Sequence, residues 1–103
     1  MKAVKVQYTV QEKYVPANTE NIKKVMNDLR EINNPGVRYS AFILDDGKTF
    51  LHFALYPDEE SMEIVSNLDS FKSFRQQLKE SQPEIPPQAE DLSLVGSAYD
   101  FFE

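Results

Sequence analysis

The stretch that decides the fold is VRYSAFILDDGKTFLHFALY, residues 37–56, because Asp46-Gly47 at its centre is typical of a tight hairpin turn. With these two residues as the loop, both would take positive φ, and Phe42 would lie opposite Leu51. Both faces of this hairpin are largely apolar, although an antiparallel sheet usually leaves one face in water. Each face therefore needs a cover. The first face carries Arg38, Ser40, Phe42, Leu44, Thr49, Leu51, Phe53 and Leu55, and the second carries Val37, Tyr39, Ala41, Ile43, Phe50, His52, Ala54 and Tyr56.

The composition excludes several function classes. The 103 residues include 17 acidic and 11 basic side chains, for a net charge of −6, with no basic cluster. Nucleic acids and anionic membranes are therefore not expected partners. The chain has no cysteine and one histidine, which excludes disulfides, thiolate chemistry and a multi-histidine metal site within one subunit. We expect a cytoplasmic, soluble single domain over residues 1–103, because the N-terminus reads as a strand and no run is long enough to span a membrane.

The periodicity of the remaining residues predicts two helices and two more strands. Residues 4–10 alternate as a first strand, and an apolar stripe from Ile22 to Ile32 predicts a helix capped by Asn18 or Thr19. A second stripe from Met62 to Leu78 predicts a helix with Asp58 as its N-cap and a possible break at 69–70. The proline-containing residues 81–90 are expected to form an extended connector. Alternation over residues 92–99 predicts the fourth strand.

The order β-α-β-β-α-β indicates an α+β, ferredoxin-like fold, with a four-stranded antiparallel sheet and two helices on one face. We expect Phe42, Leu51, Phe53 and Leu55 to face the helices, because this set is the more uniformly apolar. The other face then requires a partner, most simply a second copy of the chain in a two-fold homodimer.

Three segments resemble the antibiotic-biosynthesis-monooxygenase-like domains of the dimeric α+β barrel superfamily: PGVRYSAF at 35–42, TFLHFALYPDEESMEIV at 49–65, and SFKSF at 70–74. The resemblance implies two ferredoxin-like sheets that meet face to face as a barrel. Members include monooxygenases of quinol-like aromatics that use neither metal nor flavin, so no cofactor is implied. Tyr56 stands where members often have tryptophan, and Val65 stands where the haem-degrading branch has its histidine ligand.

His52 is the main candidate for chemistry, as a general base or hydrogen-bonding group beside Tyr39 and Tyr56. A histidine packed at a subunit interface is the structural alternative. Tyr8 is a further candidate to orient an aromatic ligand, although its face relative to the hairpin is not given by the sequence. Three other residues are candidates for ligand binding. Ala41 and Ala54 could leave space for a pocket, and Arg38 could bind a carboxylate or phenolate or form a surface ion pair.

Two functions follow from these features. One is a homodimeric domain that binds a small molecule and resembles cofactor-independent monooxygenases of aromatic or polyketide-like substrates. The other is a non-catalytic dimerisation or ligand-sensing module. A cavity lined by His52 and tyrosines would favour the first, and a tightly packed sheet–sheet interface around His52 would favour the second.

Overall fold

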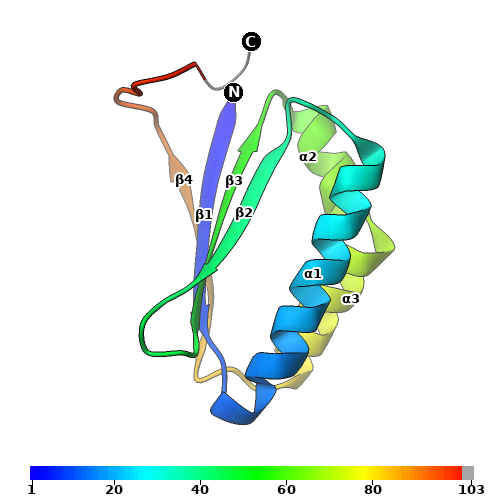
Figure 1. Ribbon diagram of the computed structural model, residues 1–103, viewed down its shortest axis with the longest axis vertical. Coiled ribbons are helices and arrows are strands. Elements are labelled where there is room, and N and C mark those ends of the chain that lie inside the picture. Colours follow the sequence, from blue (N-terminus) through cyan, green and yellow to red (C-terminus); the bar gives the residue numbers. More distant parts are fainter. Residues whose placement is uncertain (101–103) are drawn as a thin grey trace.

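The computed structural model describes residues 1–100 and shows one antiparallel sheet with all its helices on the same face (Figure 1). The strands lie in the order β2-β3-β1-β4, which is the ferredoxin-like order expected from the sequence. None of the helices in this part of the chain is long and apolar enough to cross a bilayer. The elements are β1 (Lys2–Thr9), a short 3-10 helix η1 (Glu12–Tyr14), α1 (Val15–Ile32), β2 (Arg38–Ile43), β3 (Thr49–Tyr56), α2 (Glu59–Ser66), α3 (Asp69–Glu80) and β4 (Ile85–Leu92).

The hairpin β2–β3 has the predicted register but a different turn. Phe42 pairs with Leu51 as expected. The turn is not the predicted form with two positive φ values, because Gly47 has a φ of 76° while Asp46 is not among the residues with positive φ. The Asp46 carboxylate instead accepts hydrogen bonds from the backbone N–H groups of Lys48 and Thr49, at 3.0 and 2.8 Å. This side chain stabilises a longer loop that keeps the same register.

The first helix begins earlier than predicted. It starts at Val15, with Pro16 in its first turn, where the missing N–H of proline costs nothing. Asn18 and Thr19 therefore lie inside the helix, and the prediction that either caps it was wrong. The helix ends at Asn33, whose φ of 53° is the left-handed geometry expected for that segment.

The second predicted helix is split in two. Its N-cap is confirmed, since the Asp58 carboxylate accepts from the backbone N–H of Ser61 at 2.8 Å. The break anticipated near residue 69 separates α2 from α3.

The fourth strand lies in the proline-containing segment, so the prediction of a strand over 92–99 was wrong. Strand β4 pairs with β1 from Leu92 opposite Ala3 to Ile85 opposite Thr9. It lies at the edge of the sheet, where prolines are tolerated because the outward N–H groups need no partner in the sheet. The register shifts beside Pro86 and Pro87, between the pairs made by Gln7 and Thr9. This irregularity accommodates the two residues that cannot donate.

The expectation for which face meets the helices was also wrong. The buried side chains against α1, α2 and α3 come from the second face of the hairpin, where Phe50 packs with Val25, Phe74 and Leu78. Phe42, on the first face, is 57 % exposed. The first face is more uniformly apolar, but the aromatic side chains of the second face pack against Phe74 of α3, and its polar groups are hydrogen-bonded inside the protein.

Candidate functional site

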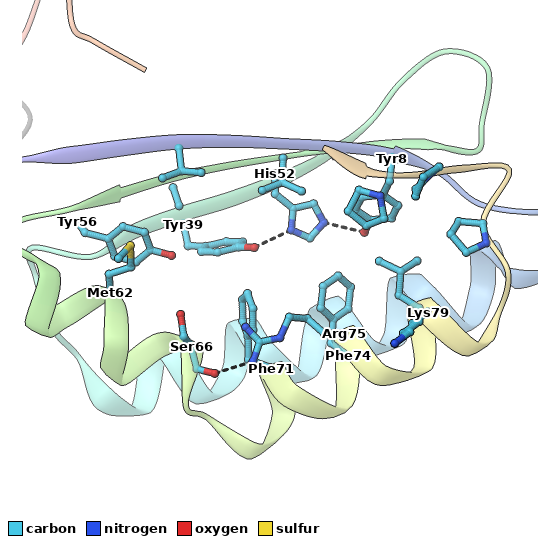
Figure 2. Close-up of a pocket in the computed structure, with 17 residues that line it drawn as sticks. Tyr8, Tyr39, His52, Tyr56, Met62, Ser66, Phe71, Phe74, Arg75 and Lys79 are labelled. Atoms are coloured by element: carbon cyan, nitrogen blue, oxygen red, sulfur yellow. Dashed lines mark hydrogen bonds between the residues drawn. The ribbon is translucent and has the colours of Figure 1, made fainter. Parts of the chain in front are cut away.

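A cavity of about 670 Å³ lies between the helix-facing side of the sheet and helices α2 and α3 (Figure 2). This volume is within the range of small-molecule sites in proteins. Its lining is mostly apolar, and the exposed residues that also line it are Arg75, Lys79, Pro86 and Pro87. The lining residues are Val4, Val6, Tyr8, Tyr39, His52, Ala54, Tyr56, Met62, Ser66, Phe71, Phe74, Arg75, Leu78, Lys79, Pro83, Pro86 and Pro87.

The strand pairing places the polar groups of the sheet side. Val6 of β1 pairs with His52 of β3, and His52 pairs with Ala41 of β2 on its other side. Because side chains alternate along a strand, Tyr8 and Tyr39 lie on the same face as His52, one on each side of it. His52 is 4 % exposed and its ring stacks against Phe74 of α3, with ring centroids 5.4 Å apart.

The imidazole of His52 is hydrogen-bonded at both nitrogens. The Tyr8 hydroxyl lies 2.8 Å from Nε2, and the Tyr39 hydroxyl lies 2.7 Å from Nδ1. Asn18 of α1, which is fully buried, donates from Nδ2 to the Tyr8 hydroxyl at 2.9 Å. Four side chains thus form one continuous hydrogen-bonded chain from the helix to the cavity.

The donors in this chain fix the tautomer of His52. The Tyr8 oxygen accepts from Asn18, and its only other hydrogen-bond partner within residues 1–100 is Nε2, so its single hydrogen is donated to Nε2. A neutral imidazole then carries its proton on Nδ1 and donates it to the Tyr39 oxygen. The hydrogen of Tyr39 remains available to a ligand in the cavity.

Burial keeps all of these groups neutral at pH 7. It lowers the pKa of His52 to about 4, because the charged imidazolium loses its hydration. Burial also raises the pKa of Tyr8, Tyr39 and Tyr56 above the ordinary value for tyrosine. His52 is thus a weak base in the free protein and acts as a neutral hydrogen-bonding group.

The structure brings together five of the seven residues that the sequence singled out. Tyr8, Tyr39, His52, Ala54 and Tyr56 all line the cavity. Ala41 pairs beside His52 but does not line the cavity, and Arg38 is exposed on the opposite face of the sheet. The ligand-binding roles suggested for these last two residues stay predictions.

Asn18 and Arg75 are the main site residues that sequence reasoning missed. Asn18 precedes Ile22, Val25 and Leu29 at the spacing of one helical face, so its place on the buried face was readable once Pro16 is taken as the helix start. Arg75 lies in the C-terminal half of α3, where a positive charge suits the helix dipole and gives no sign of a site. Its place beside the cavity depends on how α3 packs on the sheet, which periodicity does not give.

Residues 1–100 contain no group of three or more histidine, aspartate or glutamate side chains arranged to hold a metal ion.

Comparison with known proteins shows a likeness in fold without a match in sequence. No protein-family model matches the chain, and neither does any curated protein. A solved antibiotic biosynthesis monooxygenase is similar at a TM-score of 0.79 and 13 % identity, covering 93 % of this chain and 100 % of its own. A candidate enzyme of the same kind from Nitrosomonas europaea has a TM-score of 0.77 and 16 % identity, over 93 % and 100 % of the two chains. SnoaB from Streptomyces nogalater, a cofactor-independent oxygenase, has a TM-score of 0.72 and 10 % identity, over 96 % and 97 %.

These likenesses define the class by fold: the chain has the ferredoxin-like α+β architecture of antibiotic biosynthesis monooxygenase-like proteins over nearly its whole length.

Proposed function

We propose that the protein binds an aromatic small molecule in the cavity and oxygenates it without a bound metal or flavin. The observation that carries the proposal is the apolar cavity lined by Tyr39 and His52, whose hydroxyl and imidazole are hydrogen-bonded to each other. The fold shared with SnoaB, which is a cofactor-independent oxygenase, supports the same assignment.

The chemistry that suits this site is the oxidation of an electron-rich phenolic ring by dioxygen. A ring C–H opposite a hydroxyl becomes a carbonyl, so that one phenol and one O₂ give one quinone and one water, with all four electrons supplied by the substrate. The Tyr39 hydroxyl would donate a hydrogen bond to the substrate oxygen that gains negative charge. The apolar walls would exclude water from the reacting ring.

The test is oxygen consumption with anthrone as the probe, because its conversion to anthraquinone has the stoichiometry given above. We expect protein-dependent oxygen uptake equal to quinone formed, with a loss of about a hundredfold for Tyr39→Phe, which removes the donor, and about tenfold for His52→Ala, which removes the group that orients it. Tyr99→Phe is the matched control, because Tyr99 is exposed and does not line the cavity. Activity that survives His52→Ala intact would remove His52 from the catalytic role.

The alternative is a module that binds a ligand without turning it over. The cavity itself is common to both functions. Saturable binding of anthrone or anthraquinone without oxygen uptake would favour the sensing module.

We also propose that the protein is a homodimer that buries the outer face of the sheet, as in a dimeric α+β barrel. This face carries the exposed Phe42 and the half-buried Leu51 and Phe53, and no helix covers it (Figure 1). Residues 93–100 extend beyond β4 and expose further apolar side chains, among them Leu94 and Val95. A second copy on this face would bury about 800 Å² per subunit, an ordinary interface.

A further inference from the structure

The charges that line the cavity are all positive. Arg75 and Lys79 are its only charged lining residues within the part of the chain that the structure describes, and they lie one turn apart on α3. Neither forms a salt bridge with any of residues 1–100, where the ion pairs use Lys5, Lys23 and Lys48. This is unexpected in a chain with a net charge of −6, in which acidic partners are abundant.

Arg75 is held in place by contacts that do not neutralise it. One of its terminal nitrogens donates to the carbonyl oxygen of Ser66 at 2.9 Å, and its guanidinium carbon lies 4.8 Å from the centre of the Phe71 ring. A guanidinium has five N–H donors, so most of them remain for another acceptor. Figure 2 shows Arg75 on the helix side of the cavity, with Tyr39 and His52 on the sheet side.

The positive charge also acts across the cavity on the sheet side. Burial raises the pKa of Tyr39, and the charge of Arg75 opposes that rise. An anionic group between the two would therefore receive a hydrogen bond from a neutral phenol and an attraction from a guanidinium.

We propose that the ligand of this cavity is an aromatic carboxylic acid, with its rings among the apolar walls and its carboxylate bound by Arg75 and Lys79. The inference rests on the proposed function in that it places a small molecule in the same cavity, and it adds the charge of that molecule. A guanidinium binds a carboxylate through paired hydrogen bonds, and it does so more strongly beside apolar surface than in open water. The alternative is that Arg75 and Lys79 bind no ligand and are solvated residues in the C-terminal half of a helix, where the helix dipole favours positive charge.

Binding of two matched probes separates these possibilities. The probes are 9-anthracenecarboxylate and the neutral 9-anthracenemethanol, which share the ring system, titrated by fluorescence at low salt and at high salt. We expect the acid to bind about tenfold more tightly than the alcohol at low salt, with the difference reduced at high salt.

Two substitutions assign the preference to the cavity cations. Arg75→Gln should weaken binding of the acid about tenfold and leave binding of the alcohol within about twofold, and Lys79→Gln should act in the same direction with a smaller effect. Lys72→Gln is the control, because it removes one charge from the exposed face of α3 without touching the cavity lining.

The proposal is overturned if the alcohol binds as tightly as the acid, if Arg75→Gln and Lys72→Gln have equal effects, or if neither probe binds. The result does not depend on turnover. A preference for the acid without oxygen uptake would support the ligand class and reject the oxygenase. Oxygen uptake without a preference for the acid would support the oxygenase and reject the ligand class.

Discussion

Asn18 is the residue through which helix α1 acts on the cavity. Its amide donates to Tyr8, and this one hydrogen bond determines which nitrogen of His52 carries the proton. Its own side-chain oxygen is buried without a hydrogen-bond partner among the described residues. A buried polar group so poorly satisfied is a poor choice for stability alone, which favours a role in orienting its partner.

Removal of the Asn18 amide should move the proton of the imidazole. Asn18→Leu should leave the Tyr8 oxygen free to accept from Nε2, so that His52 shifts toward the form protonated at Nε2. Nitrogen NMR of the imidazole reads the tautomer directly. Asn21→Leu is the matched control, since Asn21 lies on the same helix and donates to Gln77 instead. If Asn18→Leu leaves the tautomer unchanged, Tyr8 is not oriented by the amide.

The burial of His52 makes the stability of the fold depend on pH. Its pKa falls from 6.5 in the unfolded chain to about 4 in the fold because the ring is buried. The unfolded state therefore binds the proton first, and stability is complete above pH 6.5 and declines as the pH falls toward 4. The decline should be about 3 kcal/mol across this window.

Chemical denaturation at a series of pH values measures this slope. The comparison is His52→Gln, which keeps a polar side chain but cannot take up the proton. Its slope between pH 6.5 and 4 should be lower than that of the natural chain by the contribution of one proton. Equal slopes would show that His52 does not titrate in this window.

The sequence predicts only those residues of the site that the alternation of side chains along the hairpin places on one face. The alternation in the hairpin put His52, Tyr39, Ala54 and Tyr56 on one face, and the structure places them together around the cavity. Tyr8 could not be assigned, because the pairing of β1 with β3 joins residues 40 or more positions apart. Arg75 could not be predicted either, because its position beside the cavity depends on how α3 packs on the sheet.

Local sequence signals predict the register of the β2–β3 hairpin but not the position of β4. The predicted register is correct although the predicted turn type is not. The Asp46 carboxylate stabilises a longer loop that joins the same ends of the two strands. Strand β4 was missed because the prolines of residues 81–90 predict an extended connector, whereas the edge of a sheet tolerates residues that lack a backbone donor. The alternating residues after Leu92 have the pattern of a strand but make no pairing with this sheet.

The connection between α1 and β2 passes close to Pro57, at the end of β3. A Cβ added at Gly36 would lie 2.5 Å from Cγ of Pro57, closer than side chains tolerate. Gly36→Ala should therefore push the connection away from the end of β3 and lower the free energy of unfolding by about 1–3 kcal/mol. Gly96→Ala is the control, because nothing lies within 4 Å of the added carbon there. Equal thermal stability of the two variants would contradict the expectation.

If the protein is the proposed dimer, a charge on the outer face of the sheet should separate its subunits. Phe42→Lys places a charge within the proposed interface and should convert dimer to monomer in sedimentation velocity. The fold of one subunit should persist, since Phe42 is already 57 % exposed. Ile64→Lys is the matched control, because Ile64 is 46 % exposed on α2, on the other side of the sheet. A natural chain that sediments as a monomer would reject the dimer.

The paired prolines of β4 also restrict how copies of this chain can join. An exposed edge strand is a template on which further strands add, and this is how ordered fibrous aggregates grow. Pro86 and Pro87 have no backbone N–H to offer an added strand, and they coincide with an irregularity in the pairing of β4. Addition of strands is therefore obstructed at β4. The apolar outer face of the sheet can be exposed in the monomer without making this edge a site of fibre growth.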